Sequence, residues 1–231
     1  MHDISHLFFD LDHTLWDFKL NSRETLSELF HELRLQEHGV RDVEAFIETY
    51  EEVNDEKWAA YRAGTIDKET LRKTRFSSTL KRFEVEHPEM SQHMEVEYIK
   101  RSPHKTRLFP GTLEVLGQLQ EKYEMHIITN GFSEVQDIKM SKSGLKPFFK
   151  SVISSEMVGV NKPDPKIFLH ALDSANAKRN RSVMIGDNLE ADIRGARRVG
   201  MHQVFFNPEG QSHADKISAE IHSMPQLLEL F

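Results

Sequence analysis

The second half of the chain alternates short apolar runs with amphipathic segments, and this rhythm constrains the fold more than any other feature. Short strands are predicted at 125–128, 151–154, 183–185 and 204–206, and helices at 113–122, 133–143, 165–176 and 189–199. An earlier strand is predicted at 5–11, and 204–206 is the last that the pattern indicates. Such alternation predicts an α/β fold with a doubly wound parallel sheet. Ligands of these sheets bind beyond the carboxyl ends of the strands.

A long segment between the first strand and the others has a different pattern. Its apolar residues recur at helical spacing, for example Phe46, Tyr50 and Val53, with charged residues between them. We therefore predict an all-helical insertion at 17–104, and an α/β unit made of 1–16 and 105–231. The hinge is expected at about 16–18 and 104–107, so that the insertion can close over the first strand end.

Composition narrows the classes of partner. The chain has 30 Lys and Arg against 37 Asp and Glu, a net charge of −7, which argues against nucleic acid or an anionic membrane as the main partner. It has no cysteine, which excludes disulfide scaffolds, thiolate nucleophiles and cysteine-based zinc sites. No apolar run approaches the ~20 residues of a membrane span, and none near the start resembles a signal segment. We expect a cytoplasmic protein.

The first strand ends in two aspartates, Asp10 and Asp12, followed by Thr14. Side chains alternate along a strand, so residues two apart point the same way. Like charges this close repel, and the pKa of one carboxyl should rise unless a cation lies between them. Taken alone, the pair could equally be an ordinary strand-to-turn junction.

Two later strand ends carry groups suited to an anion. Thr129, Asn130 and Gly131 combine a hydroxyl, a close backbone approach and a helix N-terminus, which together can bind phosphate. Lys162 lies in a loop beside two prolines that restrict its backbone. Taken alone, the sequence from Thr129 to Gly131 is usually only a turn, and Lys162 is usually a solvated surface lysine.

A fourth strand ends in Gly186-Asp187, and Asp192 follows five residues after Asp187. Acidic oxygens gathered at strand ends suit a hard cation such as Mg²⁺. The alternative for Asp187 alone is a helix cap.

The four strand ends, in this order, resemble the haloacid dehalogenase superfamily of aspartate-nucleophile phosphohydrolases. The resemblance covers essentially the whole chain, and the insertion after the first motif resembles that superfamily's first type of cap. The sequences Phe-Asp-Leu-Asp-His-Thr-Leu-Trp-Asp and Ile-Thr-Asn-Gly-Phe are similar to a narrower branch, the bacterial nucleoside monophosphate (pyrimidine) 5′-nucleotidases. His13 stands where the superfamily usually has Gly, a departure that this branch shares.

The resemblance implies a phosphomonoesterase. Asp10 is then the nucleophile that forms an aspartyl-phosphate, and Asp12 is the acid for the leaving group and afterwards the base for water. Mg²⁺ is expected on the Asp10 carboxylate, the Asp12 backbone carbonyl and Asp187. The substrate is expected to be a small phosphorylated metabolite, a nucleoside 5′-monophosphate in the narrower branch.

The remaining motif residues are expected to assist. Thr129, Asn130 and Lys162 would bind the phosphate oxygens, with Lys162 also neutralising charge on Asp10. Thr14 and Asp192 are expected behind the residues that touch metal and phosphate. If Asp192 contacts the metal at all, it is expected to do so through a water molecule.

Several alternatives stay open. A sugar-phosphate phosphatase or phosphomutase keeps all four motifs. A 2-haloacid dehalogenase lacks the second aspartate because a halide needs no proton, and a phosphonate hydrolase typically has Ala there. A phospho-accepting receiver-like protein places its acid pair on an earlier strand and has no such insertion. None of the 13 histidines is predicted to bind metal, and Trp58, Tyr61 and Arg62 are expected in the core of the insertion rather than at the substrate.

Overall fold

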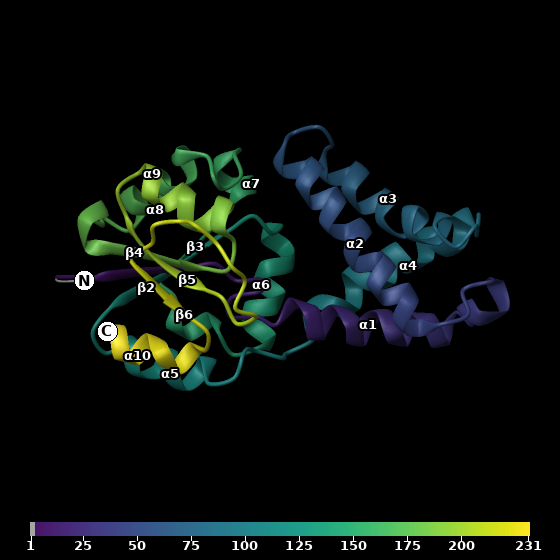
Figure 1. The fold of residues 1–231 in the computed structure, drawn as a ribbon, viewed down its shortest axis with the longest axis horizontal. Coiled ribbons are helices and arrows are strands. Elements are labelled where there is room, and N and C mark those ends of the chain that lie inside the picture. Colours follow the sequence, from purple (N-terminus) through teal and green to yellow (C-terminus); the bar gives the residue numbers. More distant parts are fainter. Residues whose placement is uncertain (1–2) are drawn as a thin grey trace. The chain divides into compact units, whose positions relative to one another are not determined.

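The computed structural model describes residues 3–231, and one part of it is built around a parallel sheet (Figure 1). The sheet has six strands in the order β3-β2-β1-β4-β5-β6. Their bounds are β1 His6–Phe9, β2 Glu124–Thr129, β3 Ser151–Ser154, β4 Ser182–Gly186, β5 His202–Phe206 and β6 Ala219–Ile221. Every neighbouring pair is parallel, which confirms the predicted doubly wound α/β sheet.

Helices cover both faces of this sheet. They are α5 Thr112–Leu119, α6 Ser133–Lys142, α7 Ser155–Val158, α8 Pro165–Ser174, α9 Gly195–Arg198 and α10 Leu227–Leu230. Helices α5 and α10 lie on one side and α8 and α9 on the other (Figure 1). Leu7 and Phe9 pack into the first apolar cluster and Phe8 into the second, as the alternation of strand side chains requires. Both faces are therefore apolar, and the polar groups remain at the strand ends.

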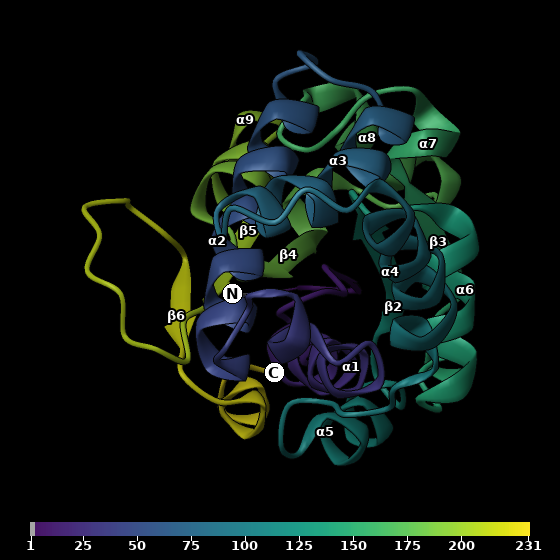
Figure 2. The ribbon, with the colours of Figure 1, turned by 90° about the vertical axis from the view of Figure 1, so that its right-hand side faces the viewer.

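Two elements differ from the sequence prediction. A sixth strand, β6, follows the run predicted to be last. It is an edge strand of three residues with only Ile221 buried, too short to show an apolar pattern. The loop 207–218 before it projects beside the sheet (Figure 2). The predicted helix at 189–199 is instead a π-helical turn, Leu189–Arg194, followed by α9.

The structure removes the alternative in which Asp187 serves as a helix cap. Asn188, and not Asp187, caps the π-helical turn: its side-chain oxygen accepts from the N–H groups of Glu190 and Ala191 at 3.1 and 2.8 Å. The Asp187 carboxylate is therefore not used as a cap.

The chain divides into two compact units. One comprises the chain up to Phe18 together with Lys105–Phe231, and the other is Lys19–His104. The second consists of α1 Phe18–Glu32, which begins at the boundary, α2 Val43–Arg62, α3 Lys68–Lys81 and α4 Pro88–Arg101, with short 3-10 turns at Leu35–His38 and Ser102–His104. Asp67 caps α3 by accepting from the Thr70 N–H at 2.7 Å.

Trp58 and Tyr61 do not belong to the buried cluster of the helical unit, so the expectation that they are core is wrong. Both are partly buried and pack edge to face, with ring centroids 5.6 Å apart, while Arg62 is exposed. The last buried residue of α2 is Asn54. Apolar residues continue at helical spacing after it, but that part of the helix is not buried, so the spacing alone was misleading.

The helical unit holds a buried ion pair. Arg75 donates to Glu95 at 2.8 Å, with only 7% and 10% of their side chains exposed, and the guanidinium lies 5.3 Å from the centre of the Tyr98 ring. Burial raises the pKa of Glu95, although Arg75 opposes this. Arg75→Met should therefore lower the free energy of unfolding by about 3–5 kcal/mol, because it leaves a buried carboxyl unpaired.

Denaturant unfolding of the full chain tests this expectation. Lys73→Met is the matched control on the same helix, because Lys73 and its partner Glu69 are both about 70% exposed and such pairs contribute under ~1 kcal/mol. Equal losses in the two variants would contradict a structural role for the buried pair.

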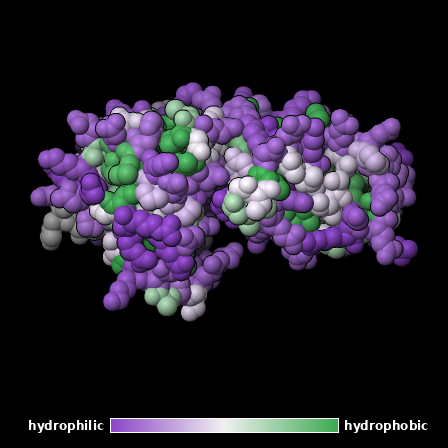
Figure 3. Space-filling view, turned by 90° about the horizontal axis from the view of Figure 1, so that it is seen from above, coloured by the Kyte–Doolittle hydropathy of each residue, from purple (hydrophilic) through white to green (hydrophobic). Residues whose placement is uncertain are grey.

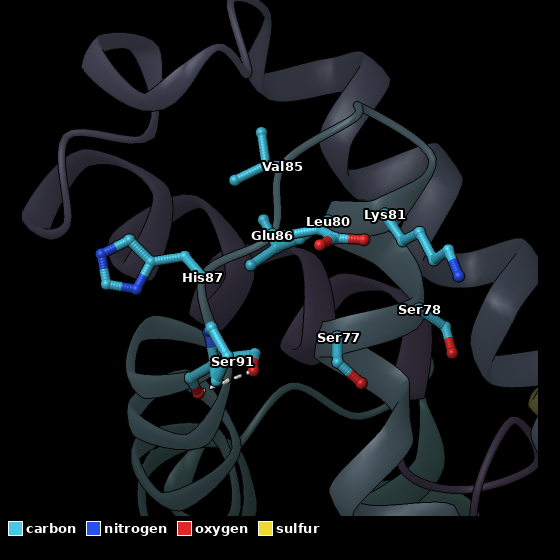
Figure 4. A pocket seen from close by; sticks show the side chains of 9 residues that line it. Ser77, Ser78, Leu80, Lys81, Val85, Glu86, His87 and Ser91 are labelled. Carbon is cyan, nitrogen blue, oxygen red and sulfur yellow. Dashed lines mark hydrogen bonds between the residues drawn. The ribbon is translucent and has the colours of Figure 1, made fainter.

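The face in Figure 3 is mostly hydrophilic on both units, with small scattered apolar patches. The helical unit has a hollow of about 290 Å³ next to the start of α4, lined by hydroxyl groups, Lys81, Glu86 and His87 (Figure 4). His87 is used structurally, since its Nδ1 accepts from the Met90 N–H at 3.2 Å.

No helix within residues 3–231 has the length and apolar character to cross a membrane.

Candidate active site

The carboxyl ends of β1 and β4, neighbours in the sheet, bring three acidic side chains together. Asp10 follows β1, Asp187 follows β4 and Asp192 lies in the π-helical turn beyond it. One carboxylate oxygen of each lies within 4.8 Å of the others. The Asp10 N–H donates to the Ile185 carbonyl at 2.9 Å, which extends the β1–β4 pairing to the site.

Lys162 is buried in the middle of this cluster. Its Nζ lies 2.5 Å from Asp10 Oδ1, 2.7 Å from Asp192 Oδ1 and 2.7 Å from the Ile128 carbonyl. The contacts with Asp10 and Ile128 are hydrogen bonds and the contact with Asp192 is an ion pair, and together they fix the position of the ammonium group. Burial opposes the charge on Lys162, but Asp10 and Asp192 outweigh it and raise its pKa above the ordinary value.

Asn130 holds the Lys162 loop. Its Oδ1 accepts from the Lys162 N–H at 2.7 Å, and its Nδ2 donates to the Lys162 carbonyl at 3.1 Å. The side-chain amide is thus already engaged on both sides. The predicted contact between Asn130 and phosphate would have to use its backbone N–H or the second proton of Nδ2.

Thr129 is oriented by two donors. Its Oγ accepts from the Gly131 N–H at 3.0 Å and from Gln136 Nε2 at 2.8 Å. The hydroxyl proton is left to donate to an anion. A Cβ on Gly131 would lie 2.1 Å from Gln136 Nε2, so a glycine is required for this contact.

Thr14 and Asp192 support the acidic groups from behind. Thr14 Oγ donates to Asp187 Oδ1 at 3.0 Å, and Asp192 Oδ2 accepts from the Asn188 N–H at 3.1 Å. Asp192 is 1% exposed, and a Cβ on Gly186 would lie 2.4 Å from its Oδ2. The expected role of both residues, behind those that touch metal and phosphate, stays a prediction.

The electrostatics of the cluster favour a divalent cation. Burial raises the pKa of Asp10 well above its usual range, and Asp192 and Asp187 add to the rise while Lys162 opposes it. Burial and Asp192 raise the pKa of Asp187 to about 7. Three carboxylates thus share the one ammonium of Lys162. Hard oxygen donors with uncompensated negative charge fit Mg²⁺.

Two residues of the site were missed by the sequence analysis. Lys139 Nζ lies 2.5 Å from Asp12 Oδ1, and Gln136 Nε2 donates to Asp12 Oδ2 at 2.8 Å. The Lys139 ammonium also lies 4.3 Å from the centre of the Trp16 ring. Burial raises the pKa of Asp12, but the ion pair with Lys139 and the two hydrogen bonds outweigh it, and the pKa is lowered overall.

The missed pair had a sequence signal. Gln136 and Lys139 are three apart, so they share a face of the helix that begins just after Thr129. Both are buried on α6 together with Met140. Polar side chains on the apolar face of a helix that starts at a strand end were the feature that could have identified them.

Comparison with known proteins assigns the family. The model of the haloacid dehalogenase-like hydrolases matches residues 4–200. The chain therefore belongs to the haloacid dehalogenase-like hydrolases, which confirms the resemblance drawn from the four strand ends, and it is an enzyme of the hydrolase class.

Its relatives match along nearly the whole chain. It is 32% identical to the pyrimidine 5′-nucleotidase YjjG of Escherichia coli over 96% of each chain. It is 31% identical to the pyrimidine 5′-nucleotidase PynA of Streptococcus pneumoniae, over 96% of this chain and 93% of that one. The structure of the hydrolase YfnB of Bacillus subtilis, which is bound to magnesium and reveals interdomain movement, superposes with a TM-score of 0.89 at 27% identity over 98% of both chains. The similarity to the narrower nucleotidase branch is thereby confirmed.

Proposed function

We propose that this chain is a Mg²⁺-dependent phosphomonoesterase that hydrolyses nucleoside 5′-monophosphates through an aspartyl-phosphate. The observation that carries the proposal is the pairing of two differently held carboxylates at one strand end. Asp10 lies against Lys162 in the acidic cluster, and Asp12 lies against Lys139 and Gln136. Carboxylates with different partners suit two roles, nucleophile and acid–base. The pKa of Asp12 is lowered in the free protein, and the negative charge of a bound phosphate would raise it for the acid role. The near full-length similarity to two pyrimidine nucleotidases supports the substrate class.

In the first half-reaction the Asp10 carboxylate attacks phosphorus and forms an acyl-phosphate bond. The bond from phosphorus to the nucleoside oxygen breaks, and Asp12 donates its proton to that oxygen. In the second half-reaction water attacks the same phosphorus and gives its proton to Asp12. Phosphate leaves, and Asp10 is restored as a carboxylate.

The phosphate oxygens are bound by groups that the fold already orients. Lys162 supplies a fixed positive charge, and Thr129 a free hydroxyl proton next to the N-terminus of α6. Mg²⁺, when bound by Asp10, Asp187 and the Asp12 carbonyl, would neutralise charge on the phosphate and the nucleophile. Asp192 and Thr14 keep Lys162 and Asp187 in place.

We also propose that the helical unit, Lys19–His104, is the cap that selects the leaving group, with the boundary beside Asp10 and Asp12 as the hinge. The chemistry at the strand ends is common to all phosphate esters, so the preference for one alcohol must come from other residues. A dehalogenase is disfavoured, because Lys139 and Gln136 hold an aspartate that halide departure does not need.

A substrate panel with Mg²⁺ tests the proposed function. Pyrimidine nucleoside 5′-monophosphates should have kcat/KM values at least about tenfold above those of purine nucleotides and of triose and hexose phosphates, a difference of ~1.4 kcal/mol in transition-state binding. Activity should vanish in excess chelator and return with Mg²⁺. Faster turnover of a sugar phosphate would reject the nucleotidase assignment, and full activity in chelator would reject the metal.

Lys139 provides a separate test of the acid–base assignment. In Lys139→Met the Asp12 carboxyl loses its cation, so its pKa rises and its protonated form persists to higher pH. The alkaline limb of the kcat/KM profile should move to higher pH. At neutral pH kcat should fall about 10-fold or more, because Asp12 is no longer held in place.

Two variants control this experiment. Lys139→Arg keeps the charge and should restore the alkaline limb, and Lys142→Met removes an exposed lysine from the same helix and should change neither quantity. If Lys139→Met lowers kcat without moving the pH profile, Lys139 has only a structural role.

A further inference from the structure

We propose that the amino ends of β1 and β2 form a binding site for a transition-metal ion of the Zn²⁺ type, made by His6, Glu124 and His126. The proposal is independent of the proposed phosphatase activity. The catalytic groups follow the carboxyl ends of the strands, and these three residues lie at the opposite edge of the sheet. His6 and His126 are 120 positions apart and only strand pairing brings them together, so no histidine ligand is predicted from the sequence.

The register of the sheet places the three side chains on one face. His6 is paired with Glu124, and Phe8 with His126, in the parallel ladder between β1 and β2. Residues two apart on a strand share a face, so Glu124 and His126 point to the same side. One candidate ligand atom of each of the three residues lies within 4.8 Å of the others.

The two imidazoles have the spacing of metal ligands. His6 Nδ1 lies 3.3 Å from His126 Nε2, and the ring centres are 5.5 Å apart. In a tetrahedral zinc site with Zn–N bonds of 2.0–2.1 Å, two nitrogen ligands are separated by about 3.3 Å. Both nitrogens can bind one metal ion when the protons of the two neutral rings lie on Nε2 of His6 and Nδ1 of His126.

The His126 ring is held in the orientation that this site needs. Its second nitrogen, Nδ1, lies 2.9 Å from the Ser151 hydroxyl on β3, and its ring stacks on Phe8 with centroids 4.8 Å apart. A hydrogen bond to the far nitrogen fixes which nitrogen binds metal, as in most histidine metal sites. Ser151 is thus the positioning residue of the site.

The surrounding charges allow the site but limit its strength. Burial, with His6 nearby, lowers the pKa of His126 to about 4, and burial lowers that of His6, so both rings are neutral at pH 7 with lone pairs available. The nearby cations Lys150 and Arg181 repel a metal ion and weaken its binding. The Glu124 carboxylate attracts the metal ion and partly offsets this repulsion. His126 is buried while Glu124 is exposed, which leaves a fourth position open to water.

Zinc binding by the full chain tests the proposal. Bound Zn²⁺ is measured after equilibrium dialysis in excess Mg²⁺, which competes at the acidic cluster, and in an Asp187→Asn background that weakens that cluster. One Zn²⁺ per chain is expected in both. His6→Gln and Glu124→Gln should each weaken it at least about 10-fold, and Ser151→Ala about 10–100-fold. Zn²⁺ should raise the thermal midpoint of the parent chain and leave that of His6→Gln unchanged.

His202→Gln is the matched control, because His202 begins β5 at the same edge of the sheet and is partly buried but lies outside the cluster. It should bind Zn²⁺ like the parent chain. Glu124 is exposed, so the Glu124→Gln variant folds even if a histidine variant does not. Equal zinc binding in Glu124→Gln and the parent chain, loss of the zinc in Asp187→Asn, or no bound zinc at all would overturn the proposal.

Discussion

Asp10→Asn should lower kcat by at least about 10⁴-fold while the protein stays folded. Replacing a nucleophile removes the covalent route entirely, which is a larger loss than misplacing a binding group. The stability expectation follows from the site. Burial already disfavours the ionised Asp10 carboxylate, and Asp187 and Asp192 repel it. A neutral amide of the same shape removes this repulsion, and Lys162 keeps Asp192 as a partner.

The experiment combines turnover, covalent trapping and unfolding. Acid quenching of the parent enzyme with a labelled phosphate ester should leave label on the protein, at Asp10, and the variant should carry none. Asp187→Asn is an informative comparison, because it weakens the proposed metal site but retains the nucleophile. It should lose activity that excess Mg²⁺ partly restores, whereas Asp10→Asn should not respond to Mg²⁺. Residual turnover of a tenth or more in Asp10→Asn would exclude the covalent mechanism.

The order of strands and helices could be predicted from the sequence because both faces of the sheet are covered. Strands such as β4 are buried at every residue, and they read as continuous apolar runs between helical segments. The edge strand β6 has no such run and was missed. The π-helical turn after β4 was missed as well, because six residues are too few to show a change in helical periodicity.

The strand-end aspartates could be predicted for a similar reason, whereas their partners could not. A residue that directly follows a buried parallel strand must lie at the carboxyl end of the sheet. The sequence could therefore predict that Asp10 and Asp187 lie close together. Which ammonium neutralises which carboxylate depends on side chains from separate loops and helices. Lys162 reaches Asp10 from a loop and Lys139 reaches Asp12 from α6, and only the first was expected.

Lys162→Met should cost both stability and activity, and the two losses should respond differently to Mg²⁺. The Lys162 side chain is 2% exposed and contacts two carboxylates and a carbonyl. Without it Asp10, Asp187 and Asp192 share a buried site with no ammonium. In metal-free buffer the free energy of unfolding should fall by about 3–5 kcal/mol, the usual cost of a buried charge left unpaired.

In Mg²⁺ much of that stability should return, because a cation at the acidic cluster takes over part of the neutralisation. The kcat value should nevertheless stay about 10²–10³-fold low, since a metal ion held by Asp10 and Asp187 does not replace the ammonium that Lys162 directs at the phosphate oxygens. Denaturant unfolding with and without Mg²⁺, run beside a turnover assay in Mg²⁺, separates the two effects. Lys166→Met, in the exposed first turn of α8, should change neither. If Mg²⁺ restores activity and stability together, Lys162 acts only as a counter-charge, and its role in binding the transferring phosphate is wrong.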